Sequence, residues 1–95
     1  MVDSHLFIFS IFRGMQAIII SRNNQKVLIR ILNMPEDEEA HIHDFVPSIF
    51  KYHSSFYFSI KEISELLKIQ KRDKRNVFHL SLKGQAIAEV LGVDR

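Results

Sequence analysis

The chain has 95 residues, of which 46% are hydrophobic and 25% are charged, and its formal net charge is +2. This length suits one domain with a single modest core, and the composition is that of an ordinary folded protein rather than a disordered chain. The absence of cysteine excludes disulfides, thiolate chemistry and cysteine-ligated zinc, and it favours a cytoplasmic location.

The charge is unevenly distributed along the chain. Residues 51–95 contain nine Lys or Arg and five Asp or Glu, a net charge of +4. Residues 1–50 contain four Lys or Arg and six Asp or Glu, a net charge of −2. An anionic partner is therefore expected to bind the C-terminal half.

The first segment, residues 3–20, is apolar at most positions. Asp3 or Ser4 can cap a helix, so we interpret the segment as a helix. The alternative is a pair of strands, which the many Ile and Phe residues and a bend at Arg13-Gly14 would suit.

The same segment is expected to be buried in protein rather than in a membrane. Arg13 and Gln16 interrupt it, and it is shorter than the roughly 20 residues that a spanning helix needs. No basic residue precedes it and no small-residue cleavage site follows it, unlike in a signal peptide. Because it is apolar on almost every side, we expect residues 1–22 to form a homodimer contact.

Ser21 is a good N-cap, and the apolar residues after it recur at helical spacing. This stripe consists of Val27, Leu28, Ile31 and Leu32. Asn33-Met34-Pro35 stops the pattern and predicts the end of a second helix. The acidic run 36–39 then reads as an exposed loop or as the first turn of a helix.

Two further apolar patterns predict a helix pair. Residues 41–50 have the spacing of a short helix, with Pro47 in its first turn. After a polar turn at 51–54, a helix is expected to begin near Ser54 or Ser55, with Phe56, Ile60, Ile63 and Leu67 on its buried face. Two short helices joined by a tight turn form a helix-turn-helix element.

Beyond Leu67 the period changes from helical to alternating, which predicts a β-hairpin. Its polar tip is expected at 71–76 and its second strand at 77–80. Ser81 can then cap a last helix that ends at Gly92. The buried stripe of this helix is predicted to be Ala86, Ile87, Val90 and Leu91.

Residues 76–91 read NVFHLSLKGQAIAEVL. They resemble the "tyrosine, any, Leu-Thr, any, Lys-Gly" ending of the MarR-like and PadR-like winged helix-turn-helix regulators, with Phe78 or His79 near the aromatic position and Ser81 in place of the threonine. A short chain without cysteine is also similar in style to small regulators of archaea and their viruses. The resemblance implies an α+β, mostly α fold with a two-stranded hairpin wing and a C-terminal helix. It implies one winged-helix domain over residues 1–95, with its core at 23–92.

A winged helix places one helix in the major groove of double-stranded DNA and the cations of its hairpin on the phosphates. We therefore predict a sequence-specific transcription regulator that needs no cofactor. The recognition-helix candidates are Ser54, Ser55, Tyr57, Ser59 and Lys61. The wing candidates are Lys71, Arg72, Lys74, Arg75 and Asn76. Tyr57 and Lys61 are expected to face outward, away from the buried stripe.

Other functions are less well supported by the sequence. His41, His43 and Asp44 lie beside Glu38 and Glu39 and could hold a metal ion, but residues two apart on a helix point in different directions. No glycine-rich phosphate loop and no catalytic triad motif is present, so no enzymatic activity is expected. The remaining alternative is a winged-helix module that binds protein through the aromatic residues 56–58.

Overall fold

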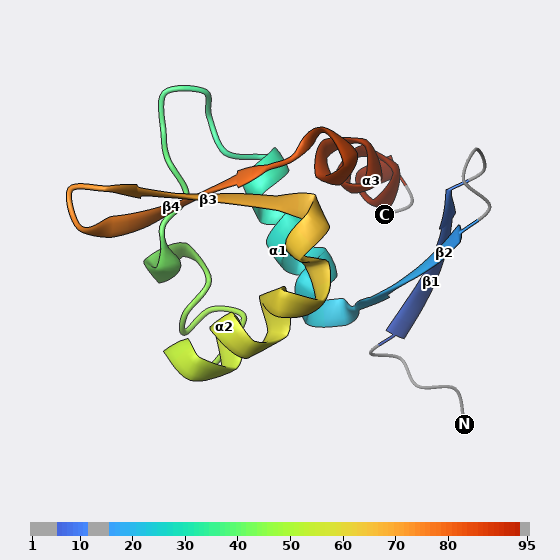
Figure 1. Ribbon diagram of the computed structural model, residues 1–95, viewed down its shortest axis with the longest axis horizontal. Helices are drawn as coiled ribbons and strands as arrows, with labels where there is room; N and C mark the ends of the chain where they lie inside the picture. The colour runs from blue at the N-terminus through green and yellow to red at the C-terminus, as the bar shows by residue number, and fades with distance from the viewer. Residues whose placement is uncertain (1–5, 12–15, 94–95) are drawn as a thin grey trace.

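Two antiparallel strand pairs lie at opposite ends of the molecule, with the helices between them (Figure 1). The computed structural model describes the backbone of residues 6–11 and 16–93 and the side chains of residues 19–92. The described elements are, in chain order, β1 (Leu6–Ile11), β2 (Gln16–Ser21), α1 (Arg22–Leu32), η1 (Ile42–Asp44), α2 (His53–Ile60), η2 (Lys61–Leu66), β3 (Leu67–Arg72), β4 (Arg75–Leu80) and α3 (Leu82–Val93). The prediction of a small α+β domain that is mainly helical is confirmed. None of the described helices has the length and apolar character needed to cross a membrane.

The predicted helix over residues 3–20 is wrong, because this segment contains the antiparallel strands β1 and β2. They pair from Leu6 with Ser21 to Ile11 with Gln16. Aromatic and β-branched residues pack well across a strand pair, which explains the preference for strands here. The proposed bend at Arg13-Gly14 lies outside the described residues.

Helix α1 begins where the sequence predicts. The Oγ atom of Ser21 accepts a hydrogen bond from the backbone N–H of Asn24 at 3.2 Å, which is the expected N-cap bond. Val27 and Leu28 are fully buried, and Asn33 closes the helix as its C-cap. The acidic run after α1 is a loop rather than a helical turn, and Glu36, Asp37 and Glu38 are exposed in it.

The predicted helix over residues 41–50 is reduced to the short 3₁₀ helix η1, followed by turns. Pro47 explains the difference, because proline has no N–H to donate and disfavours helical backbone at the residue before it. Phe45 and Phe50 are still buried, so the apolar spacing marked core residues correctly.

The following helix begins at His53, one residue earlier than expected, and has two parts. The α-helix α2 continues into the 3₁₀ helix η2, within which Ile63 has non-helical backbone angles (φ −121°, ψ 33°). Phe56, Ile60, Ile63 and Leu66 are buried along the two parts. Leu67 is buried as well, but it already belongs to β3.

The β3–β4 hairpin, which we call the wing, pairs from Leu67 with Leu80 to Arg72 with Arg75. Its turn is only Asp73-Lys74, so the polar tip is shorter than the predicted range 71–76. Both turn residues have positive φ, 52° and 68°. Two successive positive φ values are typical of the type I′ turn, whose twist matches that of the strands. Ala40 bridges Phe78 on the other edge of β4.

The predicted buried stripe of helix α3 is half right. Ile87, Ala88 and Leu91 are buried, whereas Ala86 and Val90 are exposed. The helix also continues to Val93, beyond the predicted end at Gly92. Its start is fixed as expected by Ser81, whose Oγ accepts from the backbone N–H of Gly84 at 3.0 Å and donates to the carbonyl of Glu65 at 2.7 Å.

Candidate nucleic-acid interface

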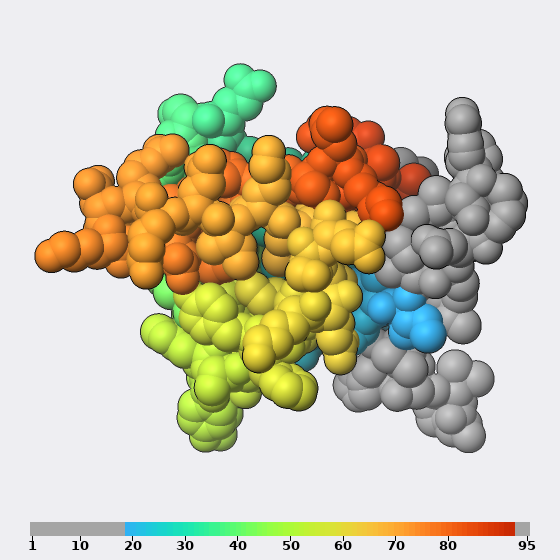
Figure 2. All heavy atoms as spheres, in the orientation of Figure 1, coloured from blue at the N-terminus to red at the C-terminus, as the bar shows by residue number. Residues whose placement is uncertain are grey.

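Helix α2 and the wing lie side by side because aromatic rings join them. The Phe56 ring of α2 lies 5.3 Å, centroid to centroid, from the Phe78 ring of β4, in an edge-to-face arrangement. The Phe45 ring stacks on that of Phe56 at 5.1 Å and meets that of Phe78 edge to face at 5.7 Å. These three rings are fully or almost fully buried, and they fix the position of the helix relative to the hairpin. Figure 2 shows both elements on one face of the molecule.

Three of the predicted recognition-helix residues are exposed: Ser54, Ser55 and Lys61. The two serines lie in the first turn of α2, and Lys61 follows its last residue. Among the described residues, no carboxylate lies within ion-pair distance of the Lys61 ammonium. These positions therefore offer hydroxyl groups and a positive charge to a ligand.

Tyr57 does not face outward as predicted. Its side chain is half-buried, its ring lies 5.2 Å from that of Phe56 and 6.3 Å from that of Phe78, and its Oη accepts a hydrogen bond of 2.8 Å from Nδ2 of Asn76. The position one residue after Phe56 points toward the wing, which the helical period alone cannot show. Tyr57 and Asn76 thus link α2 to β4.

Ser59 also has an internal partner. Its Oγ donates to Oδ1 of Asn24 at 2.9 Å, and Nδ2 of Asn24 donates to the Ser59 carbonyl at 3.0 Å. Asn24 is fully buried, so this pair satisfies its polar groups inside the protein. The pair attaches the C-terminal part of α2 to the start of α1.

The two faces of the wing differ. Partners across an antiparallel pair lie on one face, and alternate residues along a strand share it. Lys71 is paired with Asn76, and Asn76 lies on the same face as Phe78, which packs against α2. Lys71 is therefore on the α2 side of the wing, and Arg72 is on the opposite side.

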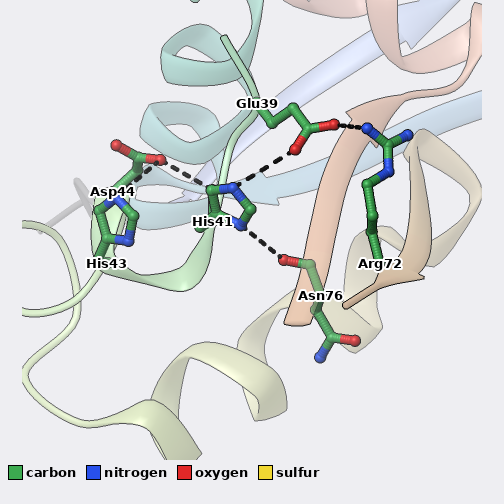
Figure 3. Close-up of polar contacts among 6 residues, drawn as sticks. All are labelled: Glu39, His41, His43, Asp44, Arg72 and Asn76. Atoms are coloured by element: carbon green, nitrogen blue, oxygen red, sulfur yellow. Dashed lines mark hydrogen bonds and ion pairs between the residues drawn. The ribbon is translucent and has the colours of Figure 1, made fainter. Parts of the chain in front are cut away.

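Arg72 has a carboxylate partner on that opposite side. Its Nη1 donates to Oε2 of Glu39, which belongs to the acidic run before η1 (Figure 3). In the described part of the chain, Lys71, Lys74 and Arg75 are exposed and have no such ion pair. The wing thus presents Lys71 on the α2 side, Lys74 in its turn, and Arg75 on the same face as its cross-strand partner Arg72. Of these four cations, only Arg72 has an ion pair with a described residue.

Further polar contacts surround Glu39. His41 lies between Glu39 and the wing: its Nε2 is 3.7 Å from Oε1 of Glu39, and its Nδ1 is 3.3 Å from the Asn76 carbonyl (Figure 3). The rings of His41 and His43 stack at 5.6 Å, and His43 approaches Asp44 at 3.9 Å. Within the described ranges, no three His, Asp or Glu side chains are grouped so as to hold a metal ion.

The sequence did not indicate the pairs Tyr57–Asn76, Ser59–Asn24 and Arg72–Glu39. Their members are 19, 35 and 33 residues apart, and no local pattern connects them. The one available signal is charge: an acidic run and a basic hairpin in one small domain attract each other.

Comparison with family models, with curated proteins and with solved structures finds no match.

Proposed function

We propose that this chain is a winged helix-turn-helix domain that binds double-stranded DNA and regulates transcription. The order of elements supports this fold. Helix α1 is followed by a strand-like residue, Ala40, which pairs with β4, then by η1, by α2 and by the β3–β4 hairpin. In such a domain α2 is the recognition helix and β3–β4 is the wing.

The observation that carries the proposal is the adjacency of an exposed polar helix start and a cation-rich hairpin. Tyr57 and Asn76 hold the two elements together. The serines Ser54 and Ser55 and the ammonium of Lys61 are then the groups that would reach base edges in the major groove. Lys71, Lys74 and Arg75 would contact phosphates of the same duplex.

In this proposal Tyr57, Ser59 and Asn76 orient the surface instead of contacting bases. A half-buried tyrosine whose hydroxyl already has a partner is better suited to fix the angle between helix and wing than to enter the groove. Arg72 is not among the phosphate contacts of this proposal, because its guanidinium is already paired with the Glu39 carboxylate.

A further part of the proposal is that the N-terminal strands β1 and β2 form the contact between two copies of the chain in a homodimer. Of the twelve residues in β1 and β2, nine are apolar and none is charged. Ile19 is 56% exposed, whereas its neighbour Ile20 is completely buried. A two-stranded hairpin is at best marginally stable by itself in water, and a second copy would cover it. To bind successive major grooves, the two recognition helices of such a dimer would have to lie about 34 Å apart.

The experiment that tests this function is selection of preferred duplexes from a random pool, followed by paired titrations at fixed salt. The selected duplex should bind at least tenfold more tightly than a scrambled duplex of the same composition, since each specific base contact discriminates by about 1–3 kcal/mol. Equal affinity for both duplexes at every salt concentration would reject sequence-specific recognition.

A protein-binding module is the second candidate, and one observation favours it. Phe58 on α2 is 71% exposed and Tyr52 just before α2 is 58% exposed, so two large aromatic side chains lie beside the proposed groove surface. Changing Phe58 to Ser separates the candidates. A DNA reader should keep its preference for the selected duplex, whereas a protein-binding module would show no such preference in either form.

A further inference from the structure

A pocket of about 530 Å³ lies behind the wing, away from α2. The end of α1, the segment 34–40, β4 and the first turn of α3 form its walls. In Figure 1 the segment 34–40 is part of the green loop that crosses the hairpin in this view, and its Ala40 bridges Phe78 of β4. Leu32, Met34 and Leu80 supply part of its apolar surface. Pockets of this size commonly accept small organic ligands.

The charged side chains of this pocket all have one sign. Its lining includes the carboxylates of Glu36, Glu38 and Glu39 and neither lysine nor arginine. Glu36 and Glu38 are exposed, and no cation of the described chain lies within ion-pair distance of them. The lining is thus mixed, with apolar side chains at Leu32, Met34 and Leu80 beside three carboxylates. Such a lining is complementary to a cation that carries a small apolar body.

One further polar group of the pocket lacks a partner. His79 lines the wall, and its Nε2 is buried with no hydrogen bond to any described residue. A buried polar atom without a hydrogen-bond partner is unfavourable.

We propose that this pocket binds an organic ammonium ion with an apolar body. The apolar body would lie against Leu32, Met34 and Leu80, and the ammonium group would lie among the carboxylates of the segment 36–39. Nothing in this binding step depends on DNA.

A second consequence rests on the proposed DNA-binding function. Glu39 lies in the pocket wall and also pairs with Arg72 of the wing (Figure 3). An ammonium ion that pairs with Glu39 competes with the guanidinium of Arg72. Arg72 would then be available to a phosphate, so the ligand should raise the affinity for DNA. By linkage, DNA should raise the affinity for the ligand by the same factor.

Methyl NMR of the full chain with phenethylamine as the probe tests the pocket. Phenethylamine should shift the methyl signals of Leu32, Met34 and Leu80 in a saturable way. It should bind about three- to tenfold more tightly than 2-phenylethanol, which has the same apolar body without the charge, and phenylacetate should not bind. The variant E36Q/E38Q should lose most of this advantage, and E62Q, which changes a carboxylate outside the pocket, should keep it. Equal binding of the amine and the alcohol, or no shift at these methyls, would overturn the proposal.

The coupling is tested by DNA titrations with phenethylamine or with methylammonium at the same ionic strength. Phenethylamine should raise the affinity of the original chain at least twofold more than methylammonium does. E39Q should bind DNA more tightly without any ligand and should no longer respond to phenethylamine. If phenethylamine binds and DNA does not, the proposed DNA-binding function is rejected and the ammonium site is kept. If DNA binds and phenethylamine does not, the ammonium site is rejected and the proposed function is kept. Binding of both without any effect of one on the other rejects the Glu39 coupling alone.

Discussion

At Gly84 the helix α3 packs closely against the backbone of Leu66. A Cβ added there would lie 1.9 Å from the carbonyl oxygen of Leu66 and 2.8 Å from its carbon, both of them backbone atoms. Gly84→Ala should therefore lower the free energy of unfolding by at least about 2 kcal/mol, as overpacking does. At Gly92 a Cβ would meet nothing within 4 Å. Gly92→Ala is thus the matched control and should raise stability by up to about 1 kcal/mol. Urea unfolding measures both, and equal stability of the two variants would contradict the close approach.

Lys74 combines a strained backbone with a useful charge. Its φ of 68° is in the left-handed region, which is unfavourable by roughly 1–2 kcal/mol for a residue with a Cβ. Lys74→Gly should raise the free energy of unfolding by about 0.5–1 kcal/mol, because glycine adopts this region readily. The same change should weaken DNA binding, because a cation is lost.

Lys74→Ala is the control, since it removes the charge and keeps the strain. Its loss of DNA affinity should equal that of Lys74→Gly, and its stability should not rise. Thermal unfolding and duplex titration, done on both variants, separate the two effects. If Lys74→Gly bound DNA as tightly as the original chain, the tip would not touch the duplex.

Contacts between residues close in sequence could be predicted from the sequence, and contacts between residues far apart in sequence could not. Ser21 and Ser81 cap the helices they were expected to cap, because a cap needs only its own residue and the next three. Tyr57 and Ser59 turned inward because their partners are far along the chain. The sequence thus predicted that the side chains of Ser54, Ser55 and Lys61 are exposed, but it could not show that those of Tyr57 and Ser59 have partners inside the protein.

Among the elements, the wing gives the clearest electrostatic prediction. Changing Lys71, Lys74 and Arg75 together to alanine should reduce the slope of log affinity against log salt by up to about 2.7, because each phosphate contact contributes roughly 0.9. Arg72→Ala should change the slope less, since Glu39 already holds that guanidinium. Lys26→Ala, which removes one exposed cation of α1, is the control for a charge lost away from the wing and should be compared with Lys74→Ala as well. Equal slopes for the triple variant and Lys26→Ala would remove the wing from the interface.

For helix α2 we predict that one substitution changes the specificity of DNA binding and another changes the stability of the fold. Lys61→Ala should narrow the affinity gap between selected and scrambled duplexes by about 1–3 kcal/mol and leave unfolding unchanged. Tyr57→Phe removes only the hydroxyl and its bond from Asn76, and it should lower stability by about 1 kcal/mol. Circular dichroism melting and duplex titrations distinguish these outcomes. If Tyr57→Phe abolished specificity without loss of stability, Tyr57 would contact bases after all.

Element type was predictable wherever polar residues marked one face. The amphipathic pattern of α1 predicted this helix correctly, and the alternation in β3 and β4 predicted the hairpin correctly. The segment 6–20 has almost no polar face, so periodicity could not separate helix from strand there. The segment 41–50 has helical apolar spacing, yet Pro47 prevents the helix, and the core residues Phe45 and Phe50 are placed by turns instead.

For the molecule as an assembly, the N-terminal strands β1 and β2 predict a dimer. Deletion of residues 1–18 keeps Ile20, which is completely buried, and Ser21, which caps α1. The shortened chain should therefore fold and sediment as a monomer, whereas the full chain should sediment as a dimer at micromolar concentration. Identical sedimentation of both as monomers would remove these strands from any interface.

The most direct test of the proposed function is amide NMR mapping of the full chain during titration with a duplex of about two helical turns. The predicted result is a set of large shift changes confined to residues 53–61 and 71–76, which come from separate elements that lie side by side on one face (Figure 2). Residues 34–39, which are behind the wing, should change little at moderate salt. Changes centred on residues 34–39, or none at 53–61 with saturating duplex, would contradict DNA recognition by α2 and the wing.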